Sequence, residues 1–415
     1  MRALYVCADA GIPLDGTKGA SVHVRQTIGA LIGAGVEVEV LAARPGSGWK
    51  SPCRVLSGTA PHPSPRSSRM SISRRRNPST LIVEAEALAA SRDLIGAVDQ
   101  SCDFDVVYER YSLWSLAGAA LSEMLGAPLV LEVNAPLVEE QQVHRRCALG
   151  GVAAEIERAV LRHAARVLCV SPPLVERAAG LRGSTEGVEL FPNAVDTDLF
   201  KPVERGGGDG DRPVTVVFTG SFKPWHGLAV LLRGFASACD DTPAARLVLA
   251  GDGPERAKMQ ALASELGIAP KVGFIGAMEH GRIPALLGEA DIAVAPYDPS
   301  GSFYFSPLKI AEYLASGLAV VASSCADLNG LLRDGRSALL VPQGDAAALG
   351  RAIARLAGDP ALRSHLGSEG RRVAVERLSL EAAAARLVNL LKDLSGSRAS
   401  GALAGESSRV EQGAS

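Results

Sequence analysis

The chain has 415 residues, more than a single hydrophobic core usually serves, and this length suits two domains. Hydrophobic residues make up 47% and charged residues 21%, which is a globular composition, and no apolar run reaches the length of a membrane span. The net charge of −2 argues against a strongly basic nucleic-acid-binding protein, so we expect no nucleic-acid partner.

Cysteine use and the first residues indicate a compartment. The seven cysteines are scattered and form no C-x-x-C pair, which argues against a disulfide framework and against a zinc site. The chain enters a strand directly, without a basic segment ahead of an apolar one, so we predict no signal peptide. The expected location is the reducing cytoplasm.

Residues 1–200 are predicted to form a first α/β domain. It begins with a buried strand, a loop, a helix and an alternating strand, at 2–8, 9–19, 21–33 and 35–42. This succession is a βαβ unit, which requires a parallel sheet with helices on its faces. Gly16 and Gly19 precede the helix, where backbone amides would meet an anion or a sugar. An equal alternative is that these glycines only shape the turn.

Residues 44–80 interrupt this pattern. Between positions 50 and 76 the chain carries Lys and Arg but no acidic residue, and it is rich in Ser and Pro. Such a segment buries too little apolar surface to fix one conformation. Two interpretations stay open: a solvated insertion, or a basic flap through which 50–76 contact an acidic acceptor or the anionic inner face of a membrane.

The α/β pattern then resumes with polar residues at a strand end. Helices are predicted at 80–98, 112–125 and 153–166, and strands at 105–108, 128–133, 167–170 and 188–193. The strand 128–133 delivers Glu132, Asn134, Glu139 and Glu140 at its carboxyl edge, where ligands bind in open α/β sheets. These side chains either face a ligand or cap the following helix.

Residues 201–212, rich in Gly and Asp, are predicted to be a linker to a second α/β domain at 213–375. Its strands are predicted at 214–219, 245–250, 272–275, 292–295 and 335–341, and its helices at 227–239, 255–266, 283–289 and 346–357. A C-terminal helix is expected within 376–394, and 395–415 are expected to be disordered. Two such domains imply a cleft that binds a small ligand.

The stretch 303–323 indicates which ligand. A turn rich in Pro, Gly and Ser leads into a short apolar helix, which a glycine ends before a β-branched strand. The start of that helix offers free N–H groups and a positive dipole end to a diphosphate, and Glu312 can accept hydrogen bonds from a ribose diol. An exposed helix carboxylate is the alternative reading of Glu312. The expected ligand is a nucleotide.

Blocks of sequence across both halves are similar to one family. In the C-terminal half these are LFPNAVDTDLF, VVFTGSFKPWHGLAVLLRGF, LVLAGDGPE, VGFIGAMEHGRIPALLGEADIAVAPY, KIAEYLASGLAVVAS and LLRDGRSALLVPQGD. In the N-terminal half they are GTKGASVHV, DVVYERY and LEVNAP. In this order the blocks resemble the retaining GT-B glycosyltransferases, specifically glycosyltransferase family four (glycosyl transferases group 1).

The resemblance implies a fold and an activity. The fold would be α/β GT-B, with two Rossmann-like domains whose parallel sheets face each other across a cleft. The enzyme would move a sugar from a nucleoside-diphosphate sugar, with UDP or GDP as the nucleotide, to a hydroxyl acceptor with retention of anomeric configuration. The acceptor would be a glycan, a lipid-linked molecule or a small molecule. The nucleotide sugar would be a co-substrate, and no cofactor is expected.

The resemblance also assigns residues of the second domain. Glu312 corresponds to the second glutamate of the family's E-x7-E motif, and the first falls at Tyr304. The Arg and Lys that neutralise the diphosphate in many relatives are replaced by Ser221 and His226. A leaving diphosphate needs positive charge or strong donors. The predicted catalytic residues are therefore Lys223, His226, Lys309 and Glu312.

Donor and acceptor contacts complete the expected site. The predicted donor-binding residues are Gly19, Gly220, Ser221, Gly251, Gly253, Ile275, Ser306, Leu308 and Glu312. The glycines have an equal explanation as turn formers. On the acceptor side Asn134 stands where relatives often carry a histidine, and Glu139, Glu140 or His144 would contact the acceptor. His23 is predicted to be a helix-face histidine with its bonds satisfied.

Other functions are weighed against transfer. A sugar-nucleotide epimerase would use the same fold, and a nucleotide-sugar-binding protein without turnover would fit the replacements at Ser221 and Tyr304. A dinucleotide oxidoreductase is disfavoured because the G-x-G-x-x-G fingerprint is missing. No D-x-D at a strand end and no His/Cys ligand spacing is found, so no metal is predicted.

Overall fold

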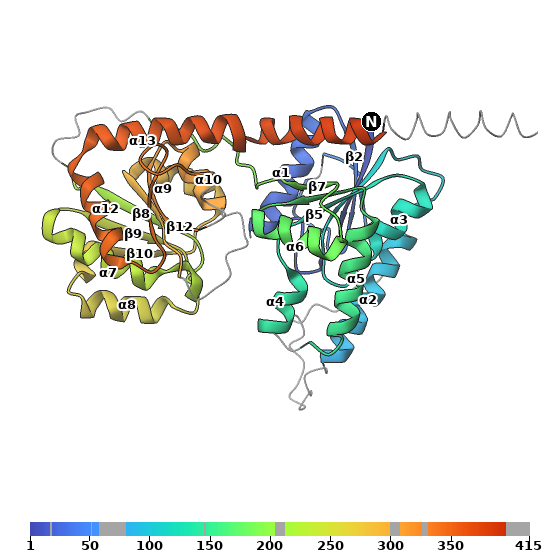
Figure 1. The fold of residues 1–415 in the computed structure, drawn as a ribbon, viewed down its shortest axis with the longest axis horizontal. Helices are drawn as coiled ribbons and strands as arrows, with labels where there is room; N and C mark the ends of the chain where they lie inside the picture. Colours follow the sequence, from blue (N-terminus) through green and yellow to red (C-terminus); the bar gives the residue numbers. More distant parts are fainter. Residues whose placement is uncertain are drawn as a thin grey trace, which may run out of the picture. The chain divides into compact units, whose positions relative to one another are not determined.

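The computed structural model describes residues 1–16, 19–50, 52–57, 80–144, 147–203, 212–298, 308–325 and 331–395. The chain divides into two compact units, one of Met1–Phe191 together with the segment from Ala384 onward, the other of Pro192–Ala383 (Figure 1). Each unit has a parallel sheet with helices packed against it, so the predicted two-domain α/β class is confirmed. No helix in the described ranges is long and apolar enough to cross a membrane.

The first unit contains a seven-stranded sheet in which every pair is parallel. Its strands are β1 (Arg2–Cys7), β2 (Glu37–Ala42), β3 (Val55–Leu56), β4 (Val106–Arg110), β5 (Leu129–Val133), β6 (Arg166–Cys169) and β7 (Val188–Leu190). The strand order is β3-β2-β1-β4-β5-β6-β7, so the direction of winding reverses between β1 and β4. Such a switch point opens a crevice at the carboxyl ends of the two strands.

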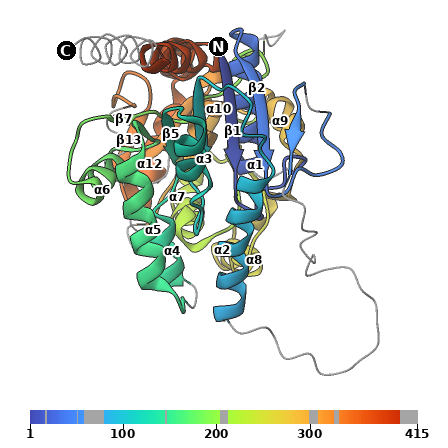
Figure 2. The ribbon, with the colours of Figure 1, turned by 90° about the vertical axis from the view of Figure 1, so that its right-hand side faces the viewer.

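Helices cover both faces of this sheet. They are α1 (Gly19–Gly33), α2 (Thr80–Gly96), α3 (Ala117–Leu125), α4 (Leu137–His144), α5 (Gly150–His163) and α6 (Pro172–Arg182). Val24, Ile28 and Leu31 of α1 are fully buried against β1 and β2, which lie side by side (Figure 2). Helix α3 packs against β4 and β5. It begins five positions later than predicted, after Trp114, whose φ of 73° is incompatible with a right-handed helix.

The second unit repeats this plan with six parallel strands. They are β8 (Thr215–Thr219), β9 (Arg246–Ala250), β10 (Val272–Gly276), β11 (Ile292–Ala295), β12 (Ala319–Ser324) and β13 (Leu339–Pro342). The order β10-β9-β8-β11-β12-β13 places the switch point between β8 and β11. The two strands diverge after Thr219 and Ala295, so a site is expected where their loops begin.

Two apolar cores lie on the two faces of this second sheet. One contains α7 (Leu228–Asp241), α8 (Arg256–Glu265) and α12 (Ala346–Gly358), and the other contains α9 (Ile283–Glu289) and α10 (Leu308–Ala315). The predicted strands and helices of this unit are found close to their expected positions. Helices α4, α6 and α13 (Pro360–Val373), together with the π-helical turn η4 (Ala374–Leu378), were not predicted.

The division between the units differs from the predicted boundary at 200. The chain passes to the second unit after Phe191, because Val195 and Phe200 belong to the second unit's core. Arg371 fixes this segment: its guanidinium donates to the carbonyl oxygens of Thr197 (3.0 Å) and Phe200 (2.7 Å). Most of the predicted basic insertion (58–79), most of the linker (204–211) and the tail from 396 lie outside the described residues.

The C-terminal helix, 380–395, is found where it was predicted, and the structure adds which unit it joins. From Ala384 it belongs to the first unit, where Leu387, Val388 and Leu391 are buried against the core formed with α1, β1 and β2. Sequence pattern indicates that this helix has an apolar face but not which sheet that face covers. The first and the last of the described residues therefore both belong to the first unit.

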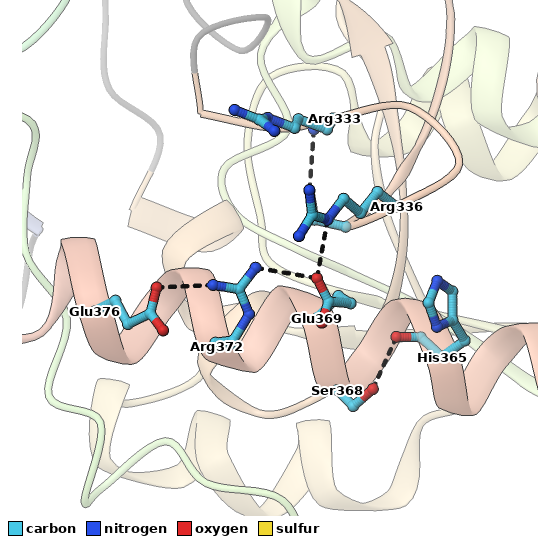
Figure 3. A network of polar contacts seen from close by, with 8 residues as sticks. Arg333, Arg336, His365, Ser368, Glu369, Arg372 and Glu376 are labelled. Atoms are coloured by element: carbon cyan, nitrogen blue, oxygen red, sulfur yellow. Dashed lines mark hydrogen bonds and ion pairs between the residues drawn. The ribbon is translucent and has the colours of Figure 1, made fainter.

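Exposed ion pairs join α13 to the loop before β13 (Figure 3). Glu369 accepts from Arg336 and from Arg372, each at 3.1 Å, and Arg372 also reaches Glu376 at 2.9 Å. The hydrogen bond from Arg372 and then that from Arg336 lower the pKa of Glu369 to about 2. Because these groups are exposed, the network defines the position of a surface loop and contributes little to stability.

Candidate active site

A buried lysine lies where the winding of the second sheet reverses. Lys309 is the second residue of α10, and its side chain reaches the loop after β8, so closely that a Cβ on Gly220 would be 2.8 Å from Nζ. The ammonium is 4.1 Å from the centroid of the Phe218 ring and 6.0 Å from that of Tyr297. It is buried, and it has no hydrogen-bond partner among the described residues.

This environment changes the acidity of Lys309. Removal from water lowers the pKa of the ammonium to about 7, although the negative charge of Glu312 acts in the opposite direction. The aromatic rings offset part of the lost hydration through cation–π attraction. A buried cation without an acceptor costs free energy, so a site of this kind gains stability when an anion enters it.

His226 lies beside Lys309, in the short 3₁₀ turn η1 (Pro224–His226). Burial, and then the charges of Lys309 and Lys223, lower the pKa of His226 to about 3. The ring is therefore neutral near pH 7, and its Nδ1–H donates to the carbonyl oxygen of Ser221. The remaining nitrogen, Nε2, is then a hydrogen-bond acceptor. His226 thus supplies an acceptor rather than the charge that the family's lysine provides.

Lys223 immediately precedes the same turn. Its Nζ is 5.8 Å from the ring centroid of Trp225, which is 41% exposed, and its charge contributes to the low pKa of His226. Lys223, His226 and Lys309, predicted as one group, are therefore brought together by the loop after β8 and the start of α10. Two of these three residues can carry positive charge at neutral pH.

Glu312 lies one turn into α10 and is 8% exposed. His280, in the 3₁₀ turn η3 (His280–Arg282), lies with its Nε2 2.8 Å from Oε1 of Glu312. A carboxylate only accepts hydrogen bonds, so Nε2 carries the proton. His280 was not predicted, because it lies 32 positions before Glu312 and only the polar character of a loop residue hints at it.

Two of the predicted glycines allow the neighbouring loops to pack closely, because a side chain there would clash with backbone. Gly251 has φ 155°, and a Cβ there would be 1.8 Å from the carbonyl oxygen of Gly220. A Cβ on Gly253 would be 2.6 Å from the carbonyl oxygen of Phe222. These loops pack backbone to backbone, which gives both glycines a structural reason and leaves their contact with a donor a prediction.

Of the other predicted donor residues, three lie along the same edge of the second sheet. Ile275, on β10, is 48% exposed, which is unusual for a strand residue of this size. Leu308 is the first residue of α10, and Ser221 is exposed in the loop after β8. Ser306 and Tyr304 lie outside the described residues. Gly19 belongs to the other unit, where it is the exposed first residue of α1.

A carboxylate with four donors lies near the switch point of the first sheet. Glu132 of β5, 2% exposed, accepts from the Tyr108 hydroxyl at 2.5 Å, Arg110 at 3.0 Å, His23 Nε2 at 2.7 Å and the Asn134 amide. Burial alone would raise its pKa, but His23, Arg110 and Asn134 together hold the pKa well below its usual range. Glu132 is therefore ionised and saturated.

The predicted acceptor-side residues separate into two groups. Asn134 joins the Glu132 cluster, whereas Glu139 is on α4, half-exposed and 3.8 Å from Arg177. Glu140 is also on α4, and the side chain of His144 lies outside the described residues. His23 is a satisfied helix-face histidine as predicted, with Glu132 as its partner. Within the described ranges, no group of three His, Cys, Asp or Glu could hold a metal ion.

Two units, each with a parallel sheet and a switch point, give the chain the GT-B fold. The chain belongs to the group 1 glycosyltransferases of family four. Residues 17–199 match the profile of Glycosyltransferase Family 4, and residues 213–359 match that of Glycosyl transferases group 1. The family identified from the sequence blocks is thus confirmed.

Three proteins similar in sequence are themselves glycosyltransferases. The chain is 30% identical to the MMP α-(1→4)-mannosyltransferase of Mycolicibacterium hassiacum, over 73% of each chain. It is 29% identical to the GDP-mannose-dependent α-(1-6)-phosphatidylinositol monomannoside mannosyltransferase of Mycolicibacterium smegmatis, over 76% of this chain and 83% of that protein. The lipopolysaccharide core glycosyltransferase LpsE of Rhizobium meliloti is 30% identical, over 54% of this chain and 63% of that protein.

Solved structures support the fold. Sucrose-phosphate synthase from Thermosynechococcus elongatus has a TM-score of 0.71 at 22% identity, covering 95% of this chain and 99% of that chain. HepE from Anabaena, in complex with UDP and glucose, has a TM-score of 0.66 at 17% identity, covering 95% and 100%.

Proposed function

We propose that this protein transfers a sugar from a UDP- or GDP-sugar to a hydroxyl acceptor, with retention of configuration and without a metal ion. The observation that carries the proposal is the buried ammonium of Lys309, which has no hydrogen-bond partner among the described residues and lies at the switch point of the second sheet. A diphosphate is the anion that a nucleotide sugar would bring there.

Each donor group has a matching side chain. Lys309 and Lys223 would bind the diphosphate, with the first N–H groups of α10 as further donors. Glu312 would accept from the ribose diol, and exposed Ile275 would contact the nucleobase. Nε2 of His226, an acceptor, would receive a hydrogen bond from a sugar hydroxyl. The UDP and glucose bound to HepE and the GDP-mannose dependence of the mycobacterial relative support this donor class.

The proposed reaction places negative charge on the departing nucleoside diphosphate. The bond between the anomeric carbon and the diphosphate oxygen breaks, and both its electrons go to the nucleoside diphosphate. The acceptor oxygen bonds to the same face of the oxocarbenium-like carbon, and its proton passes to a phosphate oxygen. Because the departing group gains negative charge, cations fixed beside it stabilise the transition state. Two lysines supply that charge, so the proposal contains no metal step.

The acceptor is proposed to bind the first unit, near the carboxyl edge of its sheet, where Asn134 follows β5. Relatives named for phosphatidylinositol mannoside and lipopolysaccharide core favour a glycan or lipid-linked acceptor. A cytoplasmic protein that touches the inner face of the membrane through 50–76 would fit such an acceptor.

The test combines turnover with binding. Purified protein is incubated with UDP- and GDP-sugars in the presence of EDTA, with and without hydroxyl acceptors, and products are identified by mass spectrometry and NMR. Release of nucleoside diphosphate, with the product anomer matching the donor, supports the proposal. An epimerised nucleotide sugar alone, or binding without chemistry, would replace it with an epimerase or a binding protein.

Removing the ribose contact gives a second check. Glu312→Ala is expected to weaken donor affinity by about 1.5–3 kcal/mol, because a charge-assisted hydrogen bond is lost. Calorimetric titration with UDP and GDP measures this. Unchanged affinity would exclude the assigned role of Glu312.

A further inference from the structure

The hydrogen bond between His280 and Glu312 fixes a carboxylate that would otherwise rotate. Nε2 of His280 is 2.8 Å from Oε1 of Glu312, and the imidazole lies 5.4 Å from the ring of Phe200, centroid to centroid. Phe200 is completely buried in the second unit's core. The histidine is therefore held by packing on one side and by the carboxylate on the other.

The two oxygens of Glu312 are not equivalent in this arrangement. Oε1 accepts a hydrogen bond from Nε2–H of His280, whereas no described residue donates a hydrogen bond to Oε2. The Glu312 side chain is 10% exposed and that of His280 is 27% exposed, so the pair borders solvent rather than closing a core. A carboxylate oriented in this way presents a defined edge to a ligand with two adjacent hydroxyls.

We propose that His280 is a positioning residue for the donor ribose: it holds Glu312 so that the carboxylate accepts from both hydroxyls of the diol. This inference rests on the proposed donor site and extends it to a residue in a different loop. His280 itself touches no reacting atom. Its loss removes the preference for ribose and leaves the diphosphate contacts of the lysines intact.

The experiment compares ribose with 2′-deoxyribose. Affinities for UDP, GDP, dUDP and dGDP are measured by calorimetry for the wild type, His280→Leu and His280→Gln. The wild type is expected to bind the better ribonucleotide about tenfold or more tightly than its deoxy form, as one charge-assisted hydrogen bond requires. His280→Leu is expected to lower this ratio at least threefold, with a smaller loss of deoxynucleotide affinity, because the deoxy form keeps one of the two hydroxyls. His280→Gln, which keeps an N–H donor, is expected to restore part of the ratio.

Controls separate positioning from folding. His365→Leu changes an exposed histidine of α13 in the same unit and is expected to leave the ratio unchanged. If His280→Leu does not fold, His280→Asn serves instead, because its shorter amide cannot reach Oε1. This variant is expected to lower the ribose-to-deoxyribose affinity ratio to the same extent.

The outcomes distinguish this inference from the proposed function. If no nucleoside diphosphate binds the wild type, the proposed function fails. If the wild type binds and prefers ribose, but His280→Leu keeps the full ratio, the inference is overturned and the donor site stands. A wild type that binds ribo and deoxy forms equally would overturn the ribose role of Glu312 and, with it, that of His280.

Discussion

The two sheets place opposite kinds of buried charge at their carboxyl edges. In the first unit Glu132 is saturated by four donors: His23 of α1, two residues of β4 and Asn134, which follows β5. In the second unit Lys309 has two aromatic rings and no hydrogen-bond acceptor among the described residues. One site is complete within the protein, and the other holds a cation that no described residue pairs by a hydrogen bond. Equivalent topology therefore does not imply equivalent function.

Removing the carboxylate of Glu132, the centre of the saturated site, should have the largest effect on the free energy of unfolding. Glu132→Ala leaves the side chain of Arg110, 11% exposed, without its counter-ion, and breaking a buried pair costs about 3–5 kcal/mol. Urea unfolding of the full chain measures the loss. Glu123→Ala, an exposed glutamate of the same unit, is the matched control and should change little. A loss for Glu132→Ala as small as that of the control would mean that the cluster is not structural.

A second carboxylate of the first unit sharpens the contrast between saturated and unsaturated charge. Glu109, on β4, accepts from Ser115 at 2.6 Å and from the Gly118 amide at 3.2 Å, and burial raises its pKa to about 7. A raised folded-state pKa gives stability that is present below pH 4.5 and lost as pH rises through 7. The loss is about 3 kcal/mol at most.

The comparison of wild type with Glu109→Gln tests this. Between pH 4.5 and 8 the unfolding free energy of the wild type should fall relative to that of Glu109→Gln, because the variant lacks the titrating carboxyl. If both proteins show the same slope, Glu109 is not the group responsible.

A change at Lys309, the unsaturated site, should alter ligand affinity rather than folding stability. Lys309→Met is expected to weaken nucleoside diphosphate affinity by about 1.5–3 kcal/mol, because one charge-assisted contact is lost. Unfolding of the unliganded protein at pH 7 should not become easier, since a desolvated ammonium is removed. Lys258→Met, at an exposed lysine of α8, provides the control. If Lys309→Met lowered stability but left affinity unchanged, Lys309 would be a structural residue and not a ligand-binding one.

The smallest expected effect is on the pH dependence of binding. Lys309 has a pKa of about 7 in the unliganded protein, and a bound diphosphate favours its charged form. Binding above pH 7 therefore takes up a proton, and affinity should be about 1 kcal/mol weaker at pH 8 than at pH 7. Calorimetry in buffers of different ionisation enthalpy detects the proton, and Lys309→Met should abolish its uptake.

The sequence predicted the helices and strands of the second unit more accurately than the pairing of its charged side chains. Strands such as β9 and β11 are apolar and short, with turn residues on either side, so their positions follow from local pattern. The boundary after Phe191 could not be found in this way, because the burial of Phe200 depends on a core built from residues far along the chain.

The candidate site shows the same limit. Glu312 was predicted because a helix start after a turn rich in Pro, Gly and Ser is a local feature, and Lys309 because the resemblance left the diphosphate without its usual cations. The partners of Glu132 and Glu312 were not, since His23 is 109 positions from Glu132 and His280 is 32 from Glu312. Whether His226 carries charge also depends on burial and on neighbouring lysines, which residue type alone does not determine.

The course of the last helix has a practical consequence for dissecting the enzyme. Because the first unit's core includes Leu387, Val388 and Leu391, a fragment cut at Phe191 would expose an apolar surface on α1 and β1. A stable isolated first unit would need residues from 384 onward supplied in trans or joined by a new linker. The second unit, continuous from Pro192 to Ala383, can be produced from one uninterrupted gene segment.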